Sequence, residues 1–116
     1  MTDLSRFHAV DAAIHARALG EIERGRKESH WMWFVFPQLR GLGRSPTALH
    51  YGLEPNEAAP FLADPRLGPR LVQIARALMA HAGQRSAVAI FGPVDALKLR
   101  SSMTLFSSVP GADPVF

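Results

Sequence analysis

Prolines that directly follow a helix-capping residue divide this chain into short segments. The pairs Ser45-Pro46, Glu54-Pro55 and Asp64-Pro65 follow one another at intervals of about ten residues. Polar side chains such as these accept hydrogen bonds from the first helical turn, and proline is favoured at the first helical position. Each pair therefore predicts the start of a helix and limits the length of the helix before it. We expect an all-α fold of several short helices around one core.

Apolar spacing and glycines complete the predicted helices. Ile14, Ala18 and Ile22 share one helical face. Leu67, Leu71, Ile74, Leu78 and Met79 form one stripe on what should be the longest helix. A first helix should carry Leu4 and Phe7 and be capped by Thr2 or Asp3, and a second should run from Asp11 to a stop at Gly25. A helix should start at 54, and another should run from Asp64 to a stop at Gly83. The other expected helices cover residues 29–36, 46–51, 86–91 and 94–107.

The bulk composition indicates one folded domain, residues 1–116. The chain is 47% hydrophobic and 20% charged, as expected of a globular protein. No apolar run approaches the roughly 20 residues of a membrane span, and the N-terminus lacks the pattern of a signal peptide. We therefore expect a cytoplasmic protein with no membrane partner. The absence of cysteine excludes disulfides, thiol catalysis and cysteine-ligated metals.

The charge balance argues against a nucleic-acid partner. Thirteen Lys and Arg residues face ten Asp and Glu residues, for a net charge of +3. Nucleic-acid binders usually carry a dense basic patch or a recognisable motif, and neither is present. We consider nucleic-acid binding unlikely, although basic and aromatic residues alternate over residues 24–44.

The stretch SHWMWFVFPQ, residues 29–38, contains both tryptophans of the chain. Ser29 is a good helix N-cap, and Pro37 should end the helix by Phe36. A strand over residues 33–36 is the alternative, because so few residues show no clear periodicity. On a helix, apolar residues would cover nearly the whole circumference. The segment is then either core or the wall of a site, and core is the more frequent outcome.

Known catalytic and metal-binding motifs are absent from the sequence. The five histidines form neither a His-x3-His pair nor HExxH, and we expect no metal site and no cofactor. There is no GxSxG turn and no phosphate-binding glycine loop. Lys98 lies three and four residues before Ser101 and Ser102, so a Ser-Lys pair is geometrically possible. The simpler interpretation is that these serines are small packing residues.

Two long strings of the sequence resemble a known family. They are GRKESHWMWFVFPQLRGLGRSP, residues 25–46, and FGPVDALKLRSSMTLFSSV, residues 91–109. With LSRFHAV and FLADPRLGPRL, they resemble the bacterial family called domain of unknown function 1810, some members of which carry a calpastatin-like label. The resemblance implies a small, mostly helical, soluble protein without an agreed activity. It also implies a further helix beyond DPVF, whose Asp113-Pro114 has the signature of a helix start.

We expect a pocket for a small anionic ligand, nucleotide-like or phosphorylated, between the aromatic helix 29–38 and the helix 94–107. The polar residues within these two apolar segments would either pair with one another or face a cavity. His30 is the candidate acid/base, since its unperturbed pKa of about 6.5 suits neutral pH. The other candidate ligand-binding residues are Lys27, Trp31, Trp33, Gln38, Lys98, Arg100, Ser101 and Ser102.

The alternative is a non-enzymatic interaction module. Its aromatic face would then contact a protein partner or a second copy of the chain. An exposed apolar patch of several hundred Å² would favour this alternative, and a narrow cleft with a polar floor would favour the ligand pocket. The sequence leaves open whether the protein is an enzyme.

Overall fold

A computed structural model describes residues 4–10, 12–41, 45–81 and 83–116. The described residues form the predicted all-α fold, without a strand longer than a single bridge. The elements are α1 (Ser5–His8), α2 (Ala12–Glu23), α3 (Met32–Val35), α4 (Pro46–Tyr51), the 3-10 turn η1 (Pro55–Glu57), α5 (Ala58–Ala63), α6 (Leu67–Met79), α7 (Ala87–Phe91) and α8 (Pro93–Ser107).

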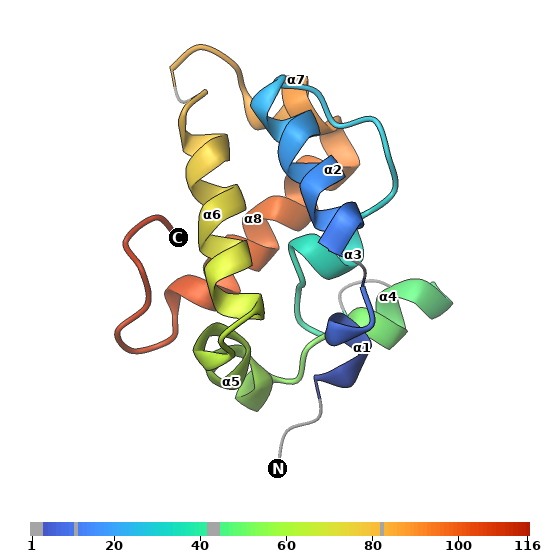
Figure 1. The fold of residues 1–116 in the computed structure, drawn as a ribbon, viewed down its shortest axis with the longest axis vertical. Coiled ribbons are helices and arrows are strands. Elements are labelled where there is room, and N and C mark those ends of the chain that lie inside the picture. Colours follow the sequence, from blue (N-terminus) through green and yellow to red (C-terminus); the bar gives the residue numbers. More distant parts are fainter. Residues whose placement is uncertain (1–3, 11, 42–44, 82) are drawn as a thin grey trace.

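Helix α8 crosses the middle of the molecule and packs on α7 and α5. In Figure 1, α2 and α6 lie toward the viewer with α8 behind them, while α1, α4 and α5 gather at the end of the molecule away from α7. Helix α2 packs on α6, α6 on α5, and α7 on α8. None of the described helices is long and apolar enough to span a membrane.

The buried side chains form one continuous cluster rich in aromatic rings. Phe7 meets Phe61 edge-on with ring centroids 5.1 Å apart, and Phe61 lies 5.3 Å from Phe106. Trp31 and Phe36 both pack on Phe91, at 6.3 and 6.0 Å. The rings thus join the N-terminal half of the chain to α7 and α8. Buried aromatic pairs of this geometry are each worth about 0.5–1.5 kcal/mol beyond their area.

Several predicted helix boundaries are confirmed by their capping bonds. Ser45 Oγ accepts from the N–H of Ala48, and Ser86 Oγ accepts from the N–H of Ala89, both at 3.1 Å. Gly25 follows α2 with a positive φ of 78°, a conformation that favours glycine. The caps predicted at Thr2, Asp3 and Asp11 lie outside the described residues.

The prediction that the longest helix begins at Asp64 is wrong in two respects. Asp64 Oδ1 accepts from the N–H groups of Arg66 and Leu67, at 2.9 and 3.0 Å, so a turn comes first and α6 begins at Leu67. Helix α6 has 13 residues and α8 has 15. Met79, predicted to lie on the apolar stripe, is 56% exposed because the helix ends there.

The aromatic segment is helical, but its helix is much shorter than predicted. Helix α3 covers only Met32–Val35, and its N-cap residue is Trp31. The predicted cap, Ser29, instead directs its hydroxyl to Glu21 Oε2 at 2.6 Å. A tertiary hydrogen bond has therefore replaced the local cap, and residues 27–31 precede the helix as irregular chain.

The chain segments that follow α3 and α8 are irregular but are held by specific hydrogen bonds. Leu39 pairs with Leu53 in an isolated parallel bridge, closed by bonds from Leu53 N–H to Gln38 O and from Arg40 N–H to Leu53 O. Asp113-Pro114 forms a turn in which Asp113 Oδ1 accepts from the N–H of Val115, at 2.9 Å.

Candidate functional site

The buried carboxylate of Glu21 fixes the entry into the aromatic segment. Its two oxygens accept four hydrogen bonds, from the N–H groups of Glu28 and Ser29, from the Ser29 hydroxyl and from the indole N–H of Trp31, at 2.6–2.9 Å. Burial alone would raise the pKa of Glu21, but the four donors outweigh burial and lower the pKa to about 2. The side chain is therefore an anion at neutral pH, held by dipoles.

Trp31 is part of the core. Its side chain is 1% exposed and its indole N–H is bonded to Glu21 at 2.9 Å. A ring with this burial has no free face for a ligand, whereas Trp33, the other predicted tryptophan, is half-buried.

Lys27 and Lys98 converge on one carboxylate, that of Asp95. Lys27 Nζ lies 2.9 Å from Asp95 Oδ2, and Lys98 Nζ lies 3.6 Å from Oδ1. Each ammonium also lies over an indole ring, Lys27 over Trp31 at 5.2 Å and Lys98 over Trp33 at 5.0 Å. We call these five residues the Asp95 cluster. The cluster brings together four of the predicted site residues, but Asp95 already neutralises one of its two positive charges.

A second group of predicted residues lies on a different face of α8. Arg100 and Ser101 line a cavity of about 400 Å³, which we call the α8 groove. Its other lining residues are Leu39, Thr104, Leu105 and Ser108. Lys98 and Arg100 are two positions apart, about 200° around a helix, so they point in opposite directions. Lys27, Trp33 and Lys98 do not line this groove, so the predicted site residues are divided between two surfaces.

The remaining predicted residues belong to neither surface. His30 is exposed, and Gln38 is half-buried in a hollow of about 10 Å³ beside Trp33. Ser102 is fully buried, and its hydroxyl has no hydrogen-bond partner in the described part of the chain. Lys98 is paired with Asp95 and forms no hydrogen bond with Ser101 or Ser102 among the described contacts. The packing interpretation of the two serines therefore fits better than a Ser-Lys nucleophile.

Four residues that matter here were missing from the sequence prediction. Glu21 and Asp95 are the acidic partners of the aromatic segment and of the two lysines. Asp95 had a local signal, because it lies three residues before Lys98 on one helix face. Thr104 and Ser108 follow Arg100 and Ser101 at the four- and seven-residue spacing of one face, which the sequence also contains. Glu21 had no such signal, because its partners are seven to ten residues away and outside its helix.

The fold and these surfaces define a small all-α protein with an anchored aromatic segment and a groove on its last helix. The chain belongs to the family described as "Protein of unknown function (DUF1810)", whose model matches residues 1–116. No curated protein matches the chain.

A solved structure resembles this fold closely. The conserved hypothetical protein Rv1873 from Mycobacterium tuberculosis is 49% identical, with a TM-score of 0.85. The match covers 90% of this chain and 75% of that one. At this identity the two chains share their helical architecture.

Proposed function

We propose that the protein binds a small anionic ligand in the α8 groove, with Arg100 as the anchoring cation. The observation that carries this proposal is a cavity of about 400 Å³ beside a guanidinium that has no ion-pair partner among the described residues. Ligand pockets usually have volumes of about 300–1,000 Å³.

The chemistry of the lining fits an anion with an apolar part. Ser101, Thr104 and Ser108 contribute hydroxyls along one side of the helix. Thr104 and Ser108 donate to carbonyl oxygens of α8, at 2.8 and 2.6 Å, so toward a ligand they present acceptors, which suit the hydroxyls of a sugar and not the anionic group. Ser101 makes no hydrogen bond within the described part of the chain, so its hydroxyl is available as a donor. Leu39 and Leu105 supply apolar walls, which suit a sugar or base beside a phosphate.

A thermal-shift screen with matched variants tests this proposal. The parent protein would be screened against nucleotides, sugar phosphates and simple anions, with Arg100→Gln and Ser101→Ala in parallel. A ligand at 100 times its dissociation constant adds about 2.7 kcal/mol, a shift of several degrees for a domain of this size. We expect a hit that Arg100→Gln loses and that Arg66→Gln, a change at another exposed arginine, keeps.

A Lys98→Met variant separates the two surfaces of α8. A ligand held in the groove should bind this variant as it binds the parent. A ligand lost in Lys98→Met but kept in Arg100→Gln would move the site to the Asp95 cluster and contradict the groove. A clean melt with no hit from any anion would also contradict the proposal.

The second candidate function is an interaction module. The surface that supports it is the start of α8, and not the aromatic face that the sequence predicted. Val94 and Leu97 at the start of α8 are each 66% exposed, whereas Trp31 and Phe36 are buried. An apolar pair on an open helix face suits contact with a second copy or a protein partner. Sedimentation of the parent and of Leu97→Glu tests this candidate, with Leu49→Glu on α4 as the matched control. Concentration-dependent association that only Leu97→Glu abolishes would support it.

A further inference from the structure

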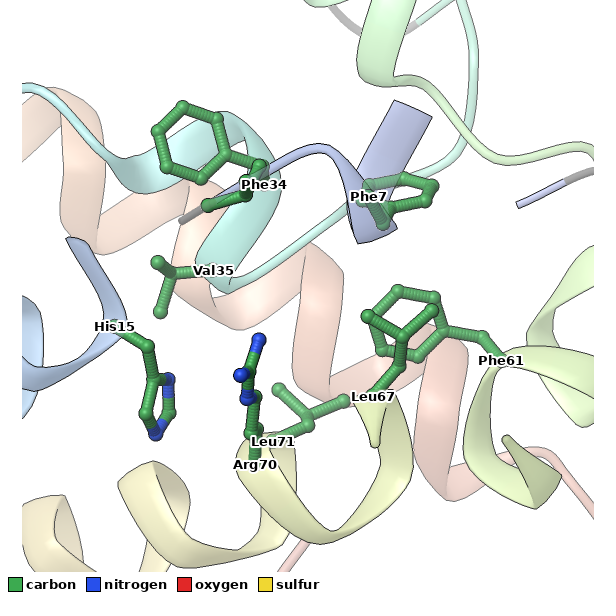
Figure 2. Close-up of a pocket in the computed structure, with 9 residues that line it drawn as sticks. Phe7, His15, Phe34, Val35, Phe61, Leu67, Arg70 and Leu71 are labelled. Atoms are coloured by element: carbon green, nitrogen blue, oxygen red, sulfur yellow. The ribbon is translucent and has the colours of Figure 1, made fainter. Parts of the chain in front are cut away.

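A second cavity, separate from the α8 groove, lies where α1, α2, α3, α5 and α6 meet. Its volume is about 30 Å³, and it shares no lining residue with the groove. Phe7, Phe34, Phe61 and Leu67 provide apolar walls. Figure 2 shows two polar side chains beside these walls, the guanidinium of Arg70 from α6 and, on the other side of Arg70, the imidazole of His15 from α2.

Arg70 differs from Arg6, the other partly buried arginine of the described residues, in having no acidic partner within the described part of the chain. Arg6, also partly buried, pairs with Glu57 at 3.2 Å, whereas no carboxylate of a described residue lies within 4.0 Å of Arg70. The Arg70 side chain is half-buried against apolar groups. A guanidinium in such surroundings gives up part of its hydration, so it gains by binding an anion there. The guanidinium fork matches the two oxygens of a carboxylate.

His15 supplies a second polar contact at the same end of the cavity. Its Nε2 lies 3.1 Å from the side-chain amide of Gln73, and an amide can accept from or donate to a ring nitrogen. The other ring nitrogen, Nδ1, is on the Arg70 side of the ring in Figure 2. In the tautomer that carries the proton on Nδ1, this nitrogen is a donor directed at the same space. The contact with Gln73 holds the ring in this orientation.

The size and lining of the cavity restrict the ligand class. A water molecule needs about 10–15 Å³ of such volume, so about 30 Å³ admits two or three groups of that size. One carboxylate and one methyl group match this space. The phenylalanine and leucine walls would contact a methyl group better than a hydroxyl or a bare inorganic ion.

We propose that Arg70 and His15 form a binding site for a small carboxylate of about the size of acetate. The carboxylate lies against the Arg70 guanidinium, and the methyl group lies against the phenylalanine walls. This site is independent of the ligand proposed for the α8 groove, so either can fail without the other.

Titration of the labelled protein with sodium acetate, followed by amide and arginine Nε–Hε NMR signals, tests the site. Chloride at the same ionic strength is the parallel titration. We expect saturable shifts at Arg70, Phe7 and Leu71 with acetate but not with chloride. Arg70→Gln should weaken binding at least about tenfold, because a charge-assisted bond pair is lost.

Two further variants make the result decisive. Arg66→Gln removes a cation one turn earlier on the chain, outside the cavity, and should bind acetate as the parent does. Arg70→Lys keeps the positive charge but not the two-pronged guanidinium, and it should bind acetate more weakly than the parent. This variant also tests the site in case Arg70→Gln does not fold. Binding that persists in Arg70→Lys at parental strength, equal shifts with chloride, or no saturation with acetate would each overturn the proposal.

Discussion

The carboxylate of Glu21 shows how one buried residue can redirect a whole segment. Ser29 would cap a helix by its own local geometry, but its hydroxyl and its N–H are both donated to Glu21. A charge-assisted hydrogen bond is roughly twice as strong as a neutral one, so the tertiary partner is preferred to the local cap. Four such bonds also compensate the burial of the charge, which would otherwise be strongly unfavourable.

Glu21→Gln should lower the free energy of unfolding by about 2–3 kcal/mol at pH 7, because the amide NH₂ cannot accept the bonds that an oxygen accepted. The pKa of Glu21 is about 2 in the folded protein against 4.5 for an ordinary glutamate. A lowered folded pKa stabilises the protein above the unfolded pKa, and the effect, about 3 kcal/mol, is lost as the pH falls from 4.5 to 2.

Urea unfolding between pH 2 and pH 7 measures this effect. The stability difference between parent and Glu21→Gln should shrink as the pH approaches 2. Glu23→Gln, two residues away and exposed, is the control and should differ little from the parent at any pH. A constant difference across the range would show that Glu21 does not titrate as stated.

Ser102→Ala should leave the protein as stable as the parent or more stable by up to about 1 kcal/mol. The Ser102 hydroxyl is buried without a partner in the described chain, so its removal also removes a desolvation penalty. Thermal melts of Ser102→Ala and Ser101→Ala measure the change. A loss of more than 1 kcal/mol for Ser102→Ala would show that the hydroxyl is bonded in solution.

At the scale of elements, the close approach of α5 and α6 depends on one glycine. Gly68 lies in the first turn of α6, where a Cβ atom would overlap the backbone carbonyl oxygen of Leu62 in α5. Leu62 cannot move without shifting α5, which packs through Phe61 into the core. The contact between the two helices therefore requires a residue without a side chain at this position.

Gly68→Ala should destabilise the protein by about 2 kcal/mol or more, since backbone shifts of this kind typically cost 1–3 kcal/mol. Gly20→Ala in α2 is the matched control, because its Cβ would meet only the flexible end of Arg24, at 3.3 Å. That change should stabilise the protein by about 0.5–1 kcal/mol through helix propensity. Differential scanning calorimetry measures both. If Gly68→Ala and Gly20→Ala changed stability in the same direction and by the same amount, the packing argument would be contradicted.

At the scale of the whole molecule, the Asp95 cluster links the loop before α3 to the last helix. Lys27 and Asp95 are far apart in sequence, and their side chains are only 10% and 20% exposed. The backbone N–H of Lys27 donates to the carbonyl oxygen of Ile90 at 2.9 Å, so the main chain ties the same loop to α7.

Asp95→Asn should reduce the free energy of unfolding by about 1–2 kcal/mol, because it leaves two partly buried ammonium groups without a carboxylate. Glu54→Gln breaks the exposed pair with Arg40, whose side chains are 43% and 49% exposed, and should change stability by less than about 0.5 kcal/mol. Urea unfolding at low and high salt compares the two. A larger loss of stability for Glu54→Gln than for Asp95→Asn would contradict this prediction.

Helix positions were largely predictable because their signals are local. A capping serine, a proline at the first turn and a terminal glycine act within four residues, so Ser45, Ser86 and Gly25 gave correct boundaries. The same locality explains why Asp64 misled the prediction of where α6 begins, since an aspartate accepts equally well in a turn that precedes a helix. The all-α class followed from the sum of these signals.

The candidate sites were less predictable, because sequence spacing does not place side chains from different helices. Lys27, Trp33 and Lys98 were predicted to share a site and do meet, but around Asp95, which takes up part of their charge. Arg100 was grouped with Lys98, yet the helix directs them to opposite sides. The Arg70 and His15 cavity had no sequence signal, because its walls come from five helices.

The sequence by itself determined where most of the short helices of this protein lie, the caps at Ser45 and Ser86, and the aromatic character of the core. These properties depend on backbone hydrogen bonds and apolar spacing within a few residues. Only the tertiary structure decided that Glu21 shortens the aromatic helix, that Asp95 pairs the lysines, and that Arg100 and Arg70 remain without carboxylate partners among the described residues. Those outcomes depend on which groups the packed helices bring within hydrogen-bond distance, since a buried charge takes the strongest partner within reach.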